Sequence, residues 1–542
     1  MTSQPPAAGE ADRARARHPD HAQSNDATVV SVRTLARSSA YVNAAQVWQI
    51  ASRLVLTPII IAALGLEGYG AWALVFGLCS YVIAVDTGAG WVYAKLTAEL
   101  DEQREYAVLS TVISSGLVVV ASAAALGLTA LWLAHAWVLP MLGVPPHLLH
   151  ETERTLAVLS AAVVFEAGAG CVLDVLAGLQ RMDLKFRFII FGSVTEFATA
   201  LALLLTGAGM VALPLGLLAG EVVSIGFGGL HCRRLRPALV LSPFRASMAG
   251  IKQVIGLGMR FQGLVLVSTT LTQGIRMLLS SLYGTSALGI FHLADRLLSV
   301  GRTPGAAVIG PLMPAFANLG AGPARRWQRL FVHASRALGL AAALPLLFAA
   351  VFAGPILFAW TGQYFPDAAW TVRVLAPMEF VILLTGVAGA RLRAAGTVRL
   401  ELTSGVLGGV LAVVGLIAAY PVAGYAGSVV AIACGRSAGA WWFLDRFFSS
   451  HHLDRWQYTR TTVLAPVLLF APAGLLLGAA AFALPMLSSG NAGRWIVLST
   501  LALLAGTYAL VCIPITWFLG LSAPTRAGIV RLIRRTRRVT RG

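Results

Sequence analysis

The sequence predicts an all-α polytopic membrane protein with about 14 transmembrane helices, and three observations carry this prediction. Hydrophobic residues make up 57% of the 542-residue chain and charged residues only 12%, whereas a soluble domain carries roughly 25% charged residues. Apolar runs of roughly 18 to 25 residues, long enough to cross a hydrocarbon core of about 30 Å, recur along the chain. Most basic residues lie in short segments between these runs, as in a multi-pass topology.

The expected membrane helices begin and end where charged or turn-forming residues interrupt the apolar runs. They cover residues 41–64, 71–94, 108–134, 155–178, 188–206, 209–231, 253–282, 286–316, 332–361, 368–390, 400–420, 424–444, 460–485 and 495–519.

The distribution of charge predicts the orientation. The chain carries 41 basic and 23 acidic residues, a formal net charge of +18. The basic excess collects before the first run, in segments such as Ala324–Arg336 and after Leu519, whereas the opposite side holds only Arg154, Arg373 and Arg494. Because basic loops stay in the cytoplasm, both termini are expected there. The charge therefore indicates topology and contact with anionic lipid rather than nucleic-acid binding.

A repeated glycine pattern predicts the domain organisation. Gly65 and Gly70 follow the first run, and Gly284 and Gly289 follow the seventh, at an offset of 219 residues. A six-helix unit fits this offset, and an even number of helices gives parallel repeats; chance is the alternative, since glycine is common in membrane helices. The expected parts are a disordered cytoplasmic tail (1–40), six N-lobe helices (41–231), a cytoplasmic linker (232–252), six C-lobe helices (253–444), two C-terminal helices (460–519) and a basic cytoplasmic tail (520–542).

Four arginines inside the apolar runs are candidates for binding an anionic headgroup. Arg53 lies in the first run, Arg276 in the seventh, and Arg296 and Arg302 in the eighth. A charged side chain at the bilayer centre costs at least roughly 2.5–3.5 kcal/mol, so each should face water or a partner. Guanidinium groups present paired donors that match phosphate oxygens. A structural ion pair between Arg302 and Asp295 is the alternative for that arginine.

Carboxylates inside the runs are candidates for ion coupling, because a buried acid facing a cavity can bind and release a proton or sodium. Asp86, Glu196 and Asp295 are the possible coupling residues, with salt bridges to the arginines as the alternative. Arg260 and Arg436 lie closer to the cytoplasmic side and are expected to snorkel to the interface.

The sequence indicates no metal and no cofactor. The cysteines are scattered singly, without the spacing of a disulfide framework or a zinc site. No Gly-x-x-x-x-Gly-Lys-Ser/Thr loop occurs, which argues against nucleotide-driven transport.

Four segments carry a resemblance to a known family. They are Leu64–Leu74 (LGLEGYGAWAL), Asp86–Gly90 (DTGAG), Gly284–Arg296 (GTSALGIFHLADR) and Trp360–Pro377 (WTGQYFPDAAWTVRVLAP). Over roughly residues 35–450 the chain resembles Wzx-type polysaccharide flippases of the MATE/MurJ-like MOP exporter superfamily.

The resemblance implies a fold and a function. Similar proteins hold two six-helix bundles, related by a pseudo-twofold axis, in a V around a central cavity that opens to either side in turn. Helices 460–485 and 495–519 resemble the pair that forms a lipid-tail groove in MurJ-like members. The implied activity moves an undecaprenyl-diphosphate-linked oligosaccharide from the cytoplasmic to the periplasmic leaflet of a bacterial inner membrane. The product would supply O-antigen, capsule or exopolysaccharide synthesis. The substrate, the lipid bilayer and other polysaccharide assembly proteins are the expected partners.

Three alternatives remain beside this interpretation. A lipid II flippase and an ion-coupled multidrug exporter belong to the same superfamily; an exporter of cations should have a cavity lined by acids rather than by arginines. A membrane glycosyltransferase, polymerase or ligase would need catalytic groups on a large external loop, and the longest external loop expected is only His135–Arg154.

Overall fold

A computed structural model describes residues 32–240, 242–319, 324–482 and 493–520 of the chain. Within them every regular element is helical. In order, they are α2 (Val32–Glu102), α3 (Tyr106–Met141), α4 (Pro146–Gly178), α5 (Met182–Leu205), η1 (Gly209–Val211), α6 (Ala212–Leu235), η2 (Pro243–Arg245), α7 (Met248–Ile309), α8 (Leu312–Leu319), α9 (Ala324–Val351), α10 (Ala353–Thr361), α11 (Pro366–Ala394), α12 (Arg399–His451), α13 (Arg455–Tyr458), η3 (Thr459–Leu464), α14 (Ala465–Phe482), α16 (Arg494–Ile515) and η4 (Thr516–Gly520).

The described residues contain 11 helices long and apolar enough to cross a membrane, and three of them are hairpins. In α2, α7 and α12 the backbone leaves the helical conformation at Gly65 (φ 70°), Gly284 (φ 82°) and Gly424 (φ 57°). Only glycine adopts positive φ readily, so the chain can turn back there without a loop. Dividing these three helices gives 14, which confirms the predicted number.

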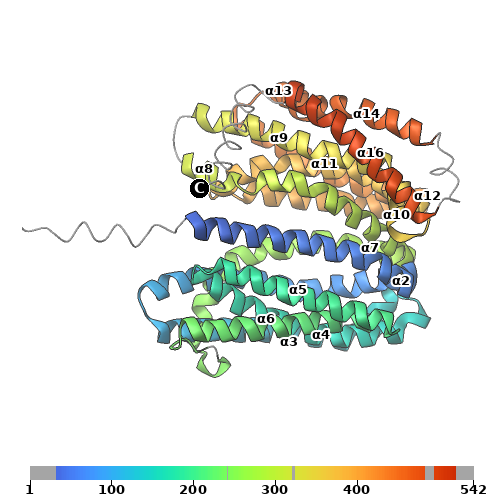
Figure 1. Ribbon diagram of the computed structural model, residues 1–542. Helices are drawn as coiled ribbons and strands as arrows, with labels where there is room; N and C mark the ends of the chain where they lie inside the picture. The colour runs from blue at the N-terminus through green and yellow to red at the C-terminus, as the bar shows by residue number, and fades with distance from the viewer. Residues whose placement is uncertain (1–31, 241, 320–323, 483–492, 521–542) are drawn as a thin grey trace, which may run out of the picture.

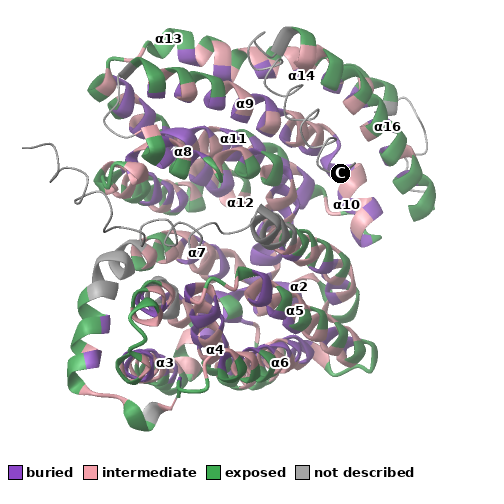
Figure 2. Cartoon of the chain, turned by 60° about the vertical axis from the view of Figure 1, so that its left-hand side comes forward, coloured by how far each residue is buried: buried purple, intermediate pink, exposed green. Residues whose placement is uncertain are grey.

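The helices gather in two groups that lie side by side. In Figures 1 and 2, α2 to α6 form one group and α8 to α16 the other, with α7 between them. The start of α2 and the end of α16 lie on the same side of the molecule, at the left of Figure 1.

Helices begin earlier and end later than hydropathy predicted. The expected tail 1–40 is wrong in part, because α2 begins at Val32, and the first 31 residues lie outside the described part, as do residues 521–542. The expected external loop His135–Arg154 is also wrong: α3 continues to Met141 and α4 begins at Pro146. A helix satisfies its own backbone hydrogen bonds beyond the apolar run, and proline at the first helical position fixes where α4 starts.

The two repeated glycine motifs contact each other. A Cβ atom on Gly70 would overlap the backbone carbonyl of Thr285, and one on Gly289 would overlap the carbonyl of Leu66. The two contacts are reciprocal, since adding the repeat offset to Leu66 gives Thr285 and adding it to Gly70 gives Gly289. Glycine is therefore required at both places, because two backbones approach there without room for a side chain.

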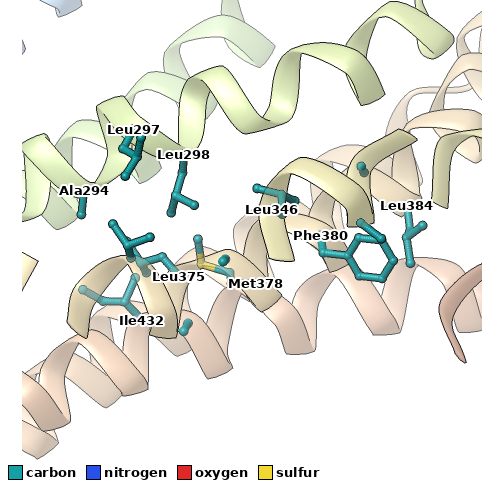
Figure 3. Packing of buried hydrophobic residues seen from close by; sticks show 14 of the residues in the cluster. Ala294, Leu297, Leu298, Leu346, Leu375, Met378, Phe380, Leu384 and Ile432 are labelled. Carbon is teal, nitrogen blue, oxygen red and sulfur yellow. The ribbon is translucent and has the colours of Figure 1, made fainter. Parts of the chain in front are cut away.

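The second half of α7 divides into an apolar and a polar face. Ala294, Leu297 and Leu298 lie on one face, three or four residues apart, and pack against α9, α11 and α12 in the largest buried cluster (Figure 3). His292 and Arg296 lie on the opposite face, and Asp295 and Arg302 lie between the two faces, where Arg302 reaches Glu379 of α11. The packing of the apolar face therefore fixes where these polar groups lie.

Large apolar side chains cover the outside of the helix groups. Leu133, Leu468, Leu503 and Leu510 are 79%, 69%, 72% and 76% exposed, and exposed residues follow the outer helices in Figure 2. Apolar surface on this scale is the surface of a protein that is solvated by lipid.

Candidate substrate site

Three arginines lie at the same depth in the membrane. Each is twelve residues from the glycine of its own hairpin: Arg53 from Gly65, Arg296 from Gly284 and Arg436 from Gly424. At 1.5 Å per residue this places all three roughly 18 Å below the hairpin turns. The turns of α7 and α12 lie together, since the rings of Tyr283 and Tyr425 are 5.9 Å apart. The turn of α2 contacts that of α7, where Gly289 approaches the carbonyl of Leu66.

Arg276 and Arg302, two of the four predicted headgroup arginines, are joined to carboxylates. Arg276 Nη2 lies 2.7 Å from Asp295 Oδ2, and Arg302 Nη2 lies 3.3 Å from Asp295 Oδ1. Arg302 Nη1 also lies 2.9 Å from Glu379 Oε1, on a side chain only 5% exposed. The alternative considered for Arg302, a structural ion pair with Asp295, is thus present. Both charges are partly neutralised, so headgroup binding by Arg276 and Arg302 stays a prediction.

Arg53 and Arg296 form no ion pair with any described residue, and Arg296 Nε is buried without a hydrogen-bond partner. They come from different helices, α2 and α7, and lie within electrostatic range of each other. Like charges repel in a medium of low dielectric constant, so two unpaired guanidinium groups at this depth favour a bound anion between them.

A cavity of about 120 Å³ lies beside Arg53, between α2, α4, α5 and α6. Its polar lining residues are Gln49, Ser52, Arg53, Ser193, Glu196, Glu221 and Ser224. Glu196 and Glu166 act electrostatically on Arg53, and Glu166 Oε2 is buried without a hydrogen-bond partner among the described residues. Arg53 and three acids, Glu166, Glu196 and Glu221, therefore lie in this part of the N-terminal helix group.

The ion-coupling candidates have different surroundings. Glu196 lines the cavity beside Arg53, Asp295 is held by two guanidinium groups, and the side chain of Asp86 lies outside the described residues. Ion coupling through these three stays a prediction. Glu166 belongs with them on geometry, although its sequence context gave no reason to prefer it over the other buried acids.

Trp360 joins the two helix groups next to Arg53. Pro58 has no N–H, so the carbonyl of Leu54, four residues earlier, loses its helical donor. The Trp360 indole Nε1 donates to that carbonyl at 2.7 Å. Arg494, at the start of α16, donates in turn to the carbonyls of Ala359 and Trp360, at 2.9 and 2.5 Å. The C-terminal helix thus contacts the segment that carries Arg53 through α10.

A second connection between the groups runs through Gln273. Its Nε2 donates to Ser80 Oγ at 3.1 Å, and its Oε1 accepts from Arg276 Nη1 at 3.3 Å. Sequence reasoning missed both this link and the Trp360 bond. The only sequence signal for either was Pro58, which guarantees a free carbonyl at Leu54 but does not say what fills it.

Arg436 was predicted to snorkel to the interface, and this stays a prediction. It lies in the wall of a pocket between α7, α11 and α12. The side chain of Arg260 lies outside the described residues.

On the side where α2 begins, Asp101 and Arg236 clamp the end of α2 to the end of α6. Arg236 Nε and Nη2 donate to the two carboxylate oxygens at 2.6 and 2.9 Å. This bidentate bond holds the pKa of Asp101 below its usual value and raises the pKa of Arg236.

Comparison with solved structures places this architecture in a known fold class. Similar structures include a multidrug resistance MATE family transporter of the MOP superfamily in an inward-facing conformation, with 16% identity and a TM-score of 0.64 over 74% of this chain and 95% of that one. The lipid II flippase MurJ in an inward closed conformation has 10% identity and a TM-score of 0.65 over 87% of this chain and 98% of that one. A point mutant of the Vibrio cholerae MATE transporter VcmN has 14% identity and a TM-score of 0.57 over 78% of this chain and 99% of that one.

The chain is therefore a multi-pass membrane protein with a fold like that of MATE transporters and MurJ. Its residues 35–319 match the model of the family described as "Polysaccharide biosynthesis protein", and the chain belongs to that family. No protein in the curated set matches the sequence. The predicted resemblance is confirmed.

Proposed function

We propose that this protein is a flippase that moves an undecaprenyl-diphosphate-linked oligosaccharide from the cytoplasmic to the outer leaflet of a bacterial inner membrane. Membership of the polysaccharide biosynthesis family supports a lipid-linked sugar as substrate. The observation that carries the proposal is the pair Arg53 and Arg296, which lie within electrostatic range on α2 and α7 without an ion-pair partner among the described residues.

A diphosphate headgroup suits this pair because its two negative charges would neutralise both guanidinium groups away from bulk water. Arg276 and Arg302, which form ion pairs with carboxylates, would contribute to the electrostatic potential around the site. The excess of basic residues on the side of both termini supports the proposed orientation. With the cytoplasm negative, the membrane potential would assist outward movement of the headgroup by roughly 2.3 kcal/mol per charge per 100 mV.

The movement would be alternating access between the two helix groups. The reciprocal contacts of Gly70 and Gly289 support a pseudo-twofold relation between an N-lobe (41–231) and a C-lobe (253–444), joined by the linker 232–252. The close backbone approach at these glycines would then close the outer side. The C-terminal pair, 460–519, would lie beside the C-lobe and form the groove for the lipid tail.

Headgroup translocation in proteoliposomes tests the proposal. The wild type should flip a fluorescent undecaprenyl-diphosphate oligosaccharide faster than empty vesicles do, and Arg53→Ala and Arg296→Ala should lose this activity. Arg399→Ala, which removes an exposed arginine at the start of α12, is the matched control and should retain it.

A different substrate class has one observation in its favour, the three acids around Arg53, since carboxylates suit an exported cation. No flipping of any diphosphate-linked sugar, together with ion-driven efflux of an organic cation, would refute the proposal in favour of a drug exporter. Flipping of lipid II alone would restrict the substrate to the peptidoglycan precursor.

A further inference from the structure

A larger pocket lies in the other helix group. Its volume is about 530 Å³, and it lies between the first half of α7, the end of α11 and both halves of α12. Small-molecule sites have volumes of roughly 300–1,000 Å³. Arg436 lines the pocket at the depth of Arg53 and Arg296, and the pocket extends toward Arg393 and Glu401, which pair at 2.7 Å.

Three of the five hydroxyl groups in the wall are arranged as acceptors. Thr272, Thr385 and Ser404 each donate to a carbonyl of their own helix, at 3.0, 2.7 and 2.9 Å. A hydroxyl group has one donor and two acceptor lone pairs. The donor is used within the helix, so the oxygens remain as acceptors for a molecule in the pocket.

Donors come from arginine. Arg436 forms no hydrogen bond or ion pair with the described residues, and it lies within electrostatic range of Asp295, whose two oxygens are already paired. Its guanidinium N–H groups therefore remain for a molecule in the pocket, at the end nearest the headgroup arginines.

The hydroxyl oxygens and Arg436 favour one of the three parts of a lipid-linked sugar, which are the prenyl tail, the diphosphate and the saccharide. A prenyl tail would leave the polar groups of the wall unsatisfied, which is costly when they are buried. A diphosphate offers only acceptors and cannot donate to three hydroxyl oxygens. A saccharide offers donors and acceptors together, and its C–H faces suit the aliphatic side chains of the wall, such as Leu271, Ile275 and Ile382.

We propose that this pocket binds the saccharide of the substrate while Arg53 and Arg296 bind its diphosphate. This proposal rests on the flippase function proposed above. The two parts of the substrate would then bind at different places. The diphosphate would lie where the helix groups meet, and the sugar would lie against α7, α11 and α12.

Gly405 allows the pocket to be filled without a clash. It lines the pocket, and a Cβ atom there would meet no atom within 4 Å. Gly405→Leu should therefore occupy pocket volume and leave the helix packing intact. Gly226→Leu in α6 is the matched control, since Gly226 has the same open surroundings and lies outside the pocket. Arg436→Gln is a second variant, which removes the free cation without adding bulk.

Calorimetric titration of the purified full chain tests the proposal with short-chain probes. Geranyl diphosphate is compared with geranyl diphosphates that carry glucose, galactose or N-acetylglucosamine. At least one sugar should tighten binding about tenfold, equivalent to about 1.4 kcal/mol. Gly405→Leu and Arg436→Gln should abolish this gain and leave the affinity for geranyl diphosphate within about twofold, whereas Gly226→Leu should keep both affinities.

Two results would overturn the proposal: no gain from any of the three sugars, or a gain that survives both Gly405→Leu and Arg436→Gln. A failure of the proposed function looks different. In that case geranyl diphosphate itself would not bind, or would bind Arg53→Ala as well as it binds the wild type.

Discussion

Replacing Trp360 by phenylalanine would isolate one hydrogen bond between the two helix groups. An aromatic ring stays and the indole N–H is lost, so the Leu54 carbonyl, which Trp360 Nε1 meets at 2.7 Å, loses its partner. Leaving a buried acceptor unsatisfied costs about 1–3 kcal/mol. We therefore expect Trp360→Phe to lower the free energy of unfolding by that amount.

Pro58 allows the reason for this loss to be tested. Pro58→Ala restores an N–H that can donate to Leu54 within α2, as in an ordinary helix. In the Pro58→Ala protein the Leu54 carbonyl no longer depends on Trp360 for a donor. Trp360→Phe should therefore leave the free energy of unfolding almost unchanged there. The two substitutions should therefore show an interaction energy of about 1 kcal/mol or more, which is far from additivity.

Titration of the unfolding free energy with sodium dodecyl sulfate in mixed micelles measures all four proteins of this cycle. Trp456→Phe is the control, because Trp456 is 66% exposed and surface changes usually stay within about 0.5 kcal/mol. If Trp360→Phe cost the same with and without Pro58→Ala, within about 0.5 kcal/mol, the reasoning would be refuted.

Three further predictions concern stability. Gly289→Leu should lower the free energy of unfolding by about 1–3 kcal/mol, because the new side chain would collide with the backbone of Leu66. Unchanged thermal unfolding would contradict the close approach of the two backbones. Glu379→Ala should lower the unfolding free energy by about 1.5–3 kcal/mol, since the partly buried Arg302 loses one of its two ion-pair partners, and Glu379→Gln should recover part of it. The pKa of Asp101 is lower in the folded protein than in the unfolded chain. Its carboxylate therefore stabilises the fold fully when the pH is above the unfolded-state pKa, and this contribution is lost as the pH falls through the folded-state pKa. Asp101→Asn should therefore reduce stability at neutral pH and flatten the decline in acid, and an unchanged melting curve across pH would show that the bond to Arg236 contributes nothing.

The sequence by itself determined the number of helices and the turns between them. Hydropathy is a local property, because each span must satisfy its own backbone hydrogen bonds in lipid. Gly65 and Gly284 could be recognised as turns for a similar reason: the first of two glycines five residues apart after an apolar run provides the positive φ that a hairpin needs. The match of both motifs also led to the family. The ends of the helices were harder to predict, since helices such as α3 extend past the apolar run from which they were predicted.

Only the tertiary structure decided which arginines have partners. In the sequence Arg53 and Arg276 are each a lone cation in an apolar run, and Arg296 and Arg302 share a run with Asp295, which could pair with either. The structure gives Arg276 and Arg302 carboxylates from α7 and α11, and leaves Arg53 and Arg296 without an ion pair among the described residues. Pairing depends on how far helices distant in sequence are shifted and rotated against each other, and hydropathy contains no information about that register. Which cations can bind a substrate is therefore set by helix packing.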